Sequence, residues 1–145
     1  MKTSKELTER LKAFEGLRLE AYRDAAGVPT IGYGHTRSVR MGDRISEYWA
    51  TELLKDDVSQ VEREVMALGV ARTQGQLDAL VSFAFNLGIG RLRRSTLLRL
   101  IRLGASEPVV RREFMRWVYA GGKRMAGLVR RREWEVKRFF ESKTI

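Results

Sequence analysis

The sequence predicts an α+β fold: a mainly α-helical domain with one small antiparallel β-sheet after the first helix. Three observations support this prediction. Apolar residues recur at spacings of three and four over most of the chain, which is typical of amphipathic helices. Residues 17–44 instead contain recurring glycines and short extended runs, which favour strands and turns. Two capping boxes mark helix starts on either side of this segment.

The first helix is expected over residues 4–14. Thr3 and Glu6 form a T-x-x-E capping box ahead of a run of leucines at helical spacing. The glycine-rich segment that follows predicts two or three short strands, one of them near residues 28–33. This sheet would be the only β-structure in the chain.

A long helix is expected over residues 46–68 and could connect two lobes, because its apolar residues keep a helical spacing for the whole length. Trp49 lies on this apolar stripe, and Trp117 and Trp134 lie on the stripes of later helices. We therefore expect all three tryptophans in the core.

The remaining helices are bounded by capping residues and glycines. A capping box at Thr73 and Gln76 begins one helix, and Gly88 and Gly90 break it. Gly104 ends the next helix, and Ser106 caps the one after it, with Pro108 in its first turn. Gly121 and Gly122 form a loop before a last helix over 128–140.

These elements predict a single domain over residues 1–145 with two lobes. A small β-containing lobe would span residues 15–45, and the helix over 46–68 would connect it to a helical lobe of residues 70–145 joined by the first helix. We expect a cleft between the lobes, since ligands commonly bind in such clefts.

The charge distribution indicates a polyanionic partner. The net charge is +10, yet residues 1–85 carry 12 Lys+Arg against 13 Asp+Glu, while residues 86–145 carry 16 against 5. Nucleic acid, an anionic membrane and an anionic cell wall would all suit this asymmetry.

The chain has no cysteine, which excludes a disulfide framework and cysteine-based metal sites. The N-terminus lacks the apolar run of a signal peptide, so we expect synthesis in the cytoplasm.

Two interpretations follow from charge alone. The first is nucleic-acid binding, suggested by the arginines Arg91, Arg93, Arg94, Arg99 and Arg102. The second is membrane disruption, because the helix over 128–140 has basic residues on one side and apolar residues on another. Against the first, no base-reading module is evident; against the second, an ordinary helix with its apolar side in the core has the same pattern.

Glu15, Asp24 and Thr30 form the candidate catalytic set. Glu15 ends the first helix beside apolar residues, a setting that favours a protonated carboxyl group able to act as an acid. Asp24 and Thr30 lie in the polar turn region, where a carboxylate and a hydroxyl could hold a water molecule. Glycosidic hydrolysis needs one acid, one carboxylate and one water. Each residue also has an ordinary interpretation, as a solvated helix end, a turn aspartate and a strand threonine.

The composite pattern is more specific than its parts. The run FEGLRLEAYRDAAGVPTIGYGHT at residues 14–36 resembles the active-site segment of the phage T4-type lysozymes, glycoside hydrolase family 24. The shared pattern is Glu, eight residues, Asp, five residues, Thr, and then a G-x-G-H turn. Residues 76–88 resemble the central buried helix of that family, and residues 117–123 and 127–135 resemble its C-terminal region.

This resemblance implies a lysozyme-like fold and a specific reaction. Members of the family act as endolysins that lyse the host cell by hydrolysing the β-1,4 bond between N-acetylmuramic acid and N-acetylglucosamine, with inversion. Glu15 would be the acid, Asp24 would position the water and Thr30 would assist it. No cofactor is implied. The partner would be peptidoglycan rather than nucleic acid, reached in the periplasm through a phage-encoded membrane pore, and the protein would be a monomer.

Further residues could support the site. His35, the only histidine, could be a proton carrier. Because the Glu/Asp pair already supplies the acid–base work, it is interpreted instead as a structural residue that pins the turn and pairs with an acidic residue of the long helix. An arginine among Arg130, Arg131 and Arg132 would lie near the catalytic glutamate, although a solvated charged face explains the same pattern. Substrate contacts are expected, by approximate position, at Thr36, Phe85, Asn86 and Ser95, with Phe85 equally suited to the core. With one histidine and no cysteine, no metal site is apparent.

Overall fold

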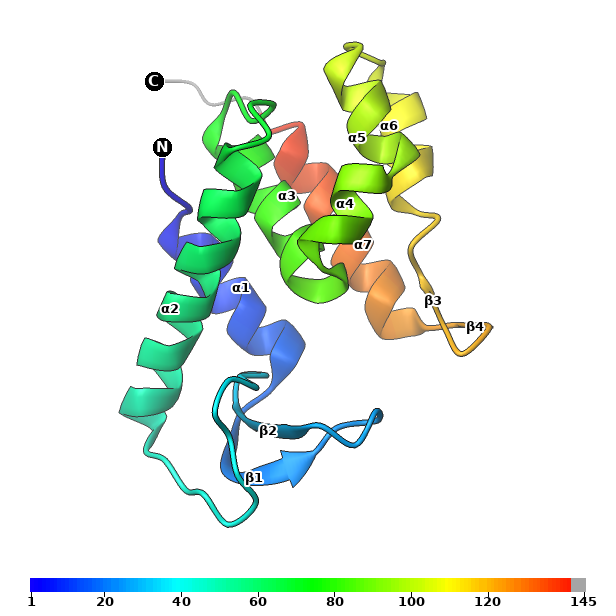
Figure 1. Cartoon of the computed structure of the whole chain (residues 1–145). Helices are drawn as coiled ribbons and strands as arrows, with labels where there is room; N and C mark the ends of the chain where they lie inside the picture. The colour runs from blue at the N-terminus through cyan, green and yellow to red at the C-terminus, as the bar shows by residue number, and fades with distance from the viewer. Residues whose placement is uncertain (142–145) are drawn as a thin grey trace. The chain divides into compact units, whose positions relative to one another are not determined.

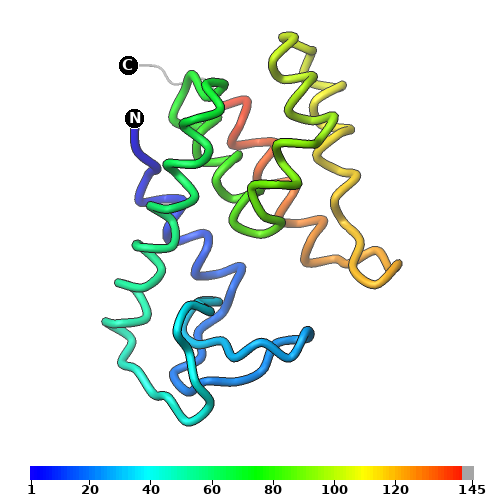
Figure 2. Tube along the Cα trace, in the orientation of Figure 1, coloured from blue at the N-terminus to red at the C-terminus, as the bar shows by residue number. Residues whose placement is uncertain are grey.

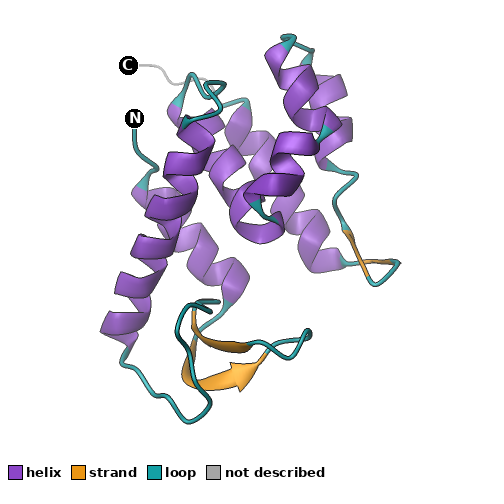
Figure 3. Ribbon diagram, viewed as in Figure 1, coloured by secondary structure: helices purple, strands orange, loops and turns teal. Residues whose placement is uncertain are grey.

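The computed structural model describes residues 1–141 of the chain. Within them, helices predominate and the strands form two small antiparallel sheets (Figures 1 and 3). The α+β prediction is therefore confirmed, with one sheet more than expected. The elements follow in the order α1 (Lys5–Glu15), β1 (Arg18–Arg23), β2 (Pro29–Gly32), α2 (Glu47–Met66), α3 (Gln74–Leu87), α4 (Ile89–Arg94), α5 (Thr96–Arg102), α6 (Glu107–Phe114), β3 (Tyr119–Ala120), β4 (Lys123–Arg124) and α7 (Ala126–Phe139).

The chain separates into two compact units. The β-containing unit comprises Lys5–Gln60, and the helical unit comprises Met1–Ser4 together with the residues from Val61 onward. The boundary falls inside α2, whose course can be followed along the chain in Figure 2. Helix α1 belongs to the β-containing unit, and not to the helical lobe as the sequence led us to expect. The contacts of α1 explain this, since the Lys12 ammonium lies 5.6 Å from the centre of the Tyr33 ring.

The sheet of the β-containing unit is a hairpin. Strands β1 and β2 pair antiparallel, with Tyr22 opposite Thr30 and Arg23 opposite Pro29, and an irregularity in register lies between Arg18 and Tyr22. An isolated bridge joins Glu20 to Arg44 beyond the hairpin. The predicted small sheet in residues 17–44 is confirmed, and its connection between the strands carries Asp24.

The buried side of α2 differs from the predicted stripe at its start. Ala50, Leu54, Val58 and Val65 are buried, whereas the side chain of Trp49 is 58% exposed. Successive helical residues are rotated by about 100°, so a stripe through Ala50 turns Trp49 to the surface. The prediction that Trp49 belongs to the core is therefore wrong.

Helix α3 is the centre of the helical unit and packs most extensively on α7 (Figure 1). The two helices approach closely at Gly75, where a Cβ atom would overlap the carbonyl oxygen of Arg138. Thr73 caps α3 as predicted, accepting a hydrogen bond of 3.1 Å from the Gln76 amide. The Gln76 side chain does not complete the capping box, because its oxygen accepts from the Arg72 amide at 2.8 Å.

The last helix is a core element. In α7, Val136 and Phe139 are buried, and the Phe139 ring contacts Phe114 edge to face at 6.0 Å. Leu128, Trp134 and Phe140, which also suggested membrane contact, are partly buried. This packing favours the ordinary interpretation of a helix whose apolar side faces the core.

Two short elements were not predicted. Helix α4 begins directly after Gly88, where a helix break was expected, and Gly121 and Gly122 form the tip of the β3–β4 hairpin. Both tip glycines have positive φ, 57° and 79°, as the tightest hairpin turns require. Strands of two residues are too short to show an alternating pattern, so the sequence indicated only a loop.

Candidate active site

Glu15 is the last residue of α1, which places its side chain at a helix end. The following Gly16 adopts a φ of +74° and donates its amide to the Lys12 carbonyl at 3.0 Å, so the helix stops there. The Glu15 side chain is partly buried. The sequence-predicted acid is therefore held at the point where the chain leaves α1 and enters β1.

A tight glycine turn lies against Glu15. Ile31 and His35 exchange two backbone hydrogen bonds of 2.9 Å, enclosing Gly32, Tyr33 and Gly34. Gly34 has a φ of +84°, and a Cβ atom at this position would lie 3.0 Å from Glu15 Oε1. A side chain here would strain the backbone and press on the carboxylate. Sequence reasoning identified the G-x-G-H turn but not the approach of Gly34 to Glu15.

Asp24 and Thr30 are fixed to the same residue of the hairpin, Val28. Asp24 Oδ1 accepts hydrogen bonds of 2.9 Å from the amides of Ala26 and Val28. The Thr30 hydroxyl donates to the Val28 carbonyl at 2.8 Å. Thr30 is 3% exposed, whereas Asp24 is exposed. The turn thus uses one carboxylate oxygen of Asp24, while Oδ2 makes no hydrogen bond with any atom of residues 1–141.

His35 pairs with the long helix, as the sequence predicts. Its Nδ1 atom lies 2.8 Å from Oδ2 of Asp57 in α2, and its Nε2 atom lies 2.9 Å from the Arg37 carbonyl oxygen. Both partner atoms are hydrogen-bond acceptors. The two contacts tie the loop after the glycine turn to α2.

The arginines at the start of α7 have separate surroundings. Arg130 is exposed, as a solvated face predicts, whereas Arg131 and Arg132 are buried. Arg131 donates to the Ser82 carbonyl at 3.1 Å. Arg132 donates to Asn86 Oδ1 at 2.9 Å. The interpretation as a solvated face is therefore wrong for Arg131 and Arg132.

Glu135 is the anionic partner of this buried group. Its Oε1 atom lies 2.7 Å from Arg132 Nε, and its Oε2 atom accepts from the Ser82 hydroxyl at 2.6 Å. Burial raises the pKa of the Glu135 carboxyl, and the guanidinium groups of Arg132 and Arg131 act against this shift. Sequence reasoning missed Glu135, although an acidic residue among the apolar positions of α7, three residues after Arg132, is the pattern of a buried ion pair.

The four expected substrate contacts are distributed over both units. Thr36 is exposed and follows His35 in the β-containing unit. Phe85 and Asn86 are partly buried near the end of α3, where Asn86 already accepts from Arg132. Ser95 is buried and caps α5, accepting from the Leu98 amide at 3.0 Å.

The fold and these residues define a class. A carboxyl group at a helix end, and a second carboxylate and a hydroxyl that both bond to Val28 in the hairpin of the same unit, are groups of the kind that a two-carboxylate glycosidase needs. Comparison with known proteins agrees: the model of the family described as phage lysozyme matches residues 12–135. The chain belongs to the phage lysozyme family, and the resemblance found in the sequence is confirmed.

Relatives of known name support this membership. The chain is 46% identical to the endolysin of Bacillus phage B103 over 144 residues, covering 93% of the chain and 53% of the relative. It is 41% identical over 137 residues to the endolysin of Acyrthosiphon pisum secondary endosymbiont phage 1, covering 91% and 92%. The chain thus spans about half the length of the first relative and most of the second.

Solved structures show the same fold. The muramidase domain of SpmX from Asticaccaulis excentricus superposes with a TM-score of 0.88 at 36% identity, covering 97% of this chain and 99% of that one. The endolysin of Escherichia coli O157:H7 phage FAHEc1 gives 0.85 at 35% identity, covering 97% and 94%. Across residues 1–141, no helix has the length and apolar character needed to span a membrane.

Proposed function

We propose that this protein is an endolysin that hydrolyses the β-1,4 bond between N-acetylmuramic acid and N-acetylglucosamine in peptidoglycan, as a lysozyme of EC 3.2.1.17 with inversion. The observation that carries the proposal is the shared anchoring of Asp24 and Thr30 on Val28, in the unit that also holds Glu15. The family membership and the muramidase and endolysin titles of its relatives support the substrate.

Glu15 acts as the general acid in this mechanism. It donates its proton to the glycosidic oxygen as the bond to the anomeric carbon breaks, so that the leaving sugar departs as an alcohol. Glu15 lies at the end of α1, and the absence of a Cβ atom at Gly34 leaves the space that its Oε1 atom approaches.

The hairpin positions the attacking water. The Thr30 hydroxyl gives its hydrogen to the Val28 carbonyl, so toward a water molecule it offers lone pairs only. Asp24 Oδ2 likewise offers lone pairs. A water molecule that donates one hydrogen bond to the Thr30 hydroxyl oxygen and one to Asp24 Oδ2 has a lone pair on its opposite side, directed toward the anomeric carbon. Asp24 then accepts the proton that the water loses on attack.

The test of the acid is turbidity loss of Gram-negative cells with permeabilised outer membranes. We expect Glu15→Gln to clear the suspension at least about a hundredfold more slowly than wild type, because removal of a general acid typically costs about 10²–10⁴-fold. Circular dichroism and urea unfolding establish that the variant is folded. Equal clearance by both proteins would refute a glycosidase mechanism.

The water-positioning role has its own test. Thr30→Val keeps the shape of the buried side chain and removes the hydroxyl, whereas Thr30→Ser keeps the hydroxyl. We expect kcat to fall about tenfold or more in the valine variant and to recover in the serine variant.

The stereochemical outcome is tested by proton NMR of the first product. Inversion gives the α-anomer, and a β-anomer would contradict inversion.

The remaining expectations belong to the same proposal. The protein acts as a monomer on glycan strands in the periplasm, after synthesis in the host cytoplasm and passage through a phage-encoded pore. Its excess of positive charge favours the anionic wall. Membrane disruption is not part of the proposal, because Val136 and Phe139 of α7 are buried in the helical unit.

A further inference from the structure

The turn that carries Asp24 depends on hydrogen bonds rather than on packing. Residues 24–28 connect β1 to β2, and all of them are exposed. The backbone closes the turn twice: the Asp24 amide donates to the Val28 carbonyl at 3.0 Å, and the Gly27 amide donates to the Asp24 carbonyl at 2.9 Å. Gly27 has a φ of +83°, and a Cβ atom there would meet no heavy atom within 4 Å. Open space therefore surrounds this part of the turn.

The Asp24 side chain has two tasks in this turn. Its Oδ1 atom helps to close the turn by accepting from the Ala26 and Val28 amides at 2.9 Å, whereas Oδ2 is left for the water molecule of the proposed reaction. The conformation of the turn thus sets the direction of Oδ2. When Asp24 accepts the proton of the attacking water, its carboxylate becomes neutral, and hydrogen bonds to a neutral group are about half as strong as those to an ionised one. The two bonds at Oδ1 therefore weaken during the reaction itself.

Arg23 supplies a brace that does not depend on the charge of Asp24. Its Nη1 atom donates to the Gly27 carbonyl at 3.0 Å. Gly27 is thus held at both its amide and its carbonyl by two consecutive residues, Asp24 and Arg23, at the end of β1. The guanidinium keeps its charge throughout, since arginine is not deprotonated in proteins. The contact of Arg23 with Gly27 therefore persists when the bonds at Asp24 Oδ1 weaken.

We propose that Arg23 is a positioning residue for the hydrolysis: it keeps the turn closed while Asp24 gains a proton, and so holds Asp24 Oδ2 in the direction that the water requires. The inference rests on the proposed function, because the direction of Oδ2 matters only if Asp24 takes part in the reaction. Arg23 acts through Asp24 and touches neither the water nor the sugar. Loss of such a residue lowers kcat and leaves KM nearly unchanged, because it affects the reacting step and not the binding of the glycan.

The kinetic experiment measures the release of reducing ends from peptidoglycan. Arg23→Met removes the donor and keeps an unbranched side chain, and Arg23→Lys restores a donor. Arg40→Met is the matched control, because Arg40 is an exposed arginine of the same unit whose side chain makes no hydrogen bond or ion pair within residues 1–141. We expect Arg23→Met to lower kcat about three- to tenfold with KM within about twofold of wild type, Arg23→Lys to recover at least about half of kcat, and Arg40→Met to behave as wild type.

A second comparison separates positioning from stability. In the Asp24→Ala background no carboxylate remains to be positioned, so Arg23→Met should change kcat by less than about twofold there. A general loss of folded protein would instead lower kcat equally in both backgrounds. Urea unfolding should give the same stability for Arg23→Met and Arg40→Met, because both side chains are exposed.

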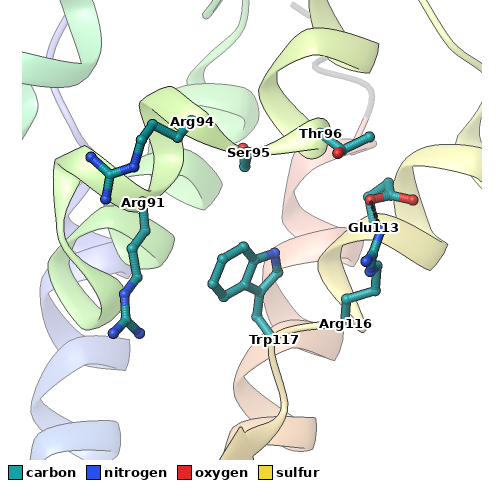
Figure 4. Close-up of a pocket in the computed structure, with 7 residues that line it drawn as sticks. All are labelled: Arg91, Arg94, Ser95, Thr96, Glu113, Arg116 and Trp117. Carbon is teal, nitrogen blue, oxygen red and sulfur yellow. Dashed lines mark hydrogen bonds and ion pairs between the residues drawn. The ribbon is translucent and has the colours of Figure 1, made fainter.

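Amide hydrogen exchange without substrate, followed by NMR, tests the brace directly. The Ala26 and Val28 amides bond to Asp24 Oδ1, and their exchange should be about three- to tenfold faster in Arg23→Met and unchanged in Arg40→Met. The Trp117 amide, which donates to the Phe114 carbonyl at 3.1 Å, is the reference. Trp117 lines the pocket shown in Figure 4, in the helical unit, so its exchange should be equal in all variants.

The inference is overturned if Arg23→Met keeps the kcat of wild type, if Arg40→Met loses as much, or if Arg23→Lys is no faster than Arg23→Met. An equal loss with and without the carboxylate at position 24 would also overturn it, as would unchanged exchange of the Ala26 and Val28 amides. A wild type that releases no reducing ends, combined with faster exchange in Arg23→Met, would refute the proposed function and leave Arg23 as a brace of the turn without a catalytic role.

Discussion

Gly34→Ala tests whether the glycine turn has a catalytic role as well as a conformational one. Two costs arise at this position. The backbone φ of +84° disfavours any L-residue with a Cβ, at about 1–2 kcal/mol. The new methyl group would also lie 3.0 Å from Glu15 Oε1, closer than ordinary van der Waals contact, so the carboxylate must shift by a few tenths of an ångström.

The two costs affect different observables. The backbone cost lowers the free energy of unfolding by about 1–2 kcal/mol. The displacement of Glu15 adds little to this, because a side-chain carboxylate moves easily. A displaced general acid, however, loses its alignment with the glycosidic oxygen. Misplacement by about 1 Å can cost about a hundredfold in rate, so a shift of a few tenths of an ångström should cost less. We therefore expect kcat to fall several-fold, up to about tenfold, while the variant stays folded.

Gly69→Ala is the matched control. Gly69 has a φ of +70°, and a Cβ atom there would meet no heavy atom within 4 Å. It should lose comparable stability in urea unfolding and retain wild-type release of reducing ends from peptidoglycan. If both variants lose the same stability and keep the same activity, the approach of Gly34 to Glu15 has no bearing on catalysis. A Gly34→Ala variant that fails to fold would contradict the energy estimate.

Three further variants test the packing described above. Gly75→Ala should lower the free energy of unfolding by about 3 kcal/mol, the upper part of the range for overpacking, because the added methyl meets the backbone carbonyl of Arg138 and one helix must move; a loss below 1 kcal/mol in urea unfolding would show that α3 and α7 yield easily. Glu135→Gln should lower the free energy of unfolding by about 3–5 kcal/mol, because it leaves Arg132 buried without an anion. Glu135→Leu combined with Arg132→Met should recover most of this loss. A double variant no more stable than Glu135→Gln would show that the ion pair itself stabilises the fold. Trp49→Ala should change stability by no more than about 0.5 kcal/mol, since the side chain is largely exposed, and a larger loss would restore Trp49 to the core.

The helices and the hairpin were predictable because local rules decide them. Leucines such as Leu7 and Leu11 repeat at helical spacing and are fully buried. The β1–β2 hairpin was predictable because Gly27 allows the positive φ that its turn requires. The pairing of His35 with an acidic residue of α2 was predictable because a histidine that pins a turn needs hydrogen-bond partners.

What the sequence did not predict depends on contacts between distant residues. Periodicity gives the existence of α2 and most of its buried side, but it does not distinguish Trp49 from Ala50 in the first turn, so Trp49 was assigned to the wrong side. Arginine is ordinarily a surface residue, and the burial of Arg132 depends on partners that include Glu135 and Asn86. The contact of Gly34 with Glu15 joins residues 19 positions apart, and no local pattern indicates that distance.

The junction at Ser4 has a consequence for the order of folding during synthesis. Ser4 donates its amide and hydroxyl to the two oxygens of Asp78, and Arg138 donates to the same carboxylate from α7 at 3.0 and 2.8 Å. Residues 5–60 are thus inserted within the chain of the helical unit. The β-containing unit can form contacts while the ribosome is still translating, but the helical unit must wait for α7. Ser4 leaves the ribosome before α7 and obtains its complete set of partners only after α7 has been translated.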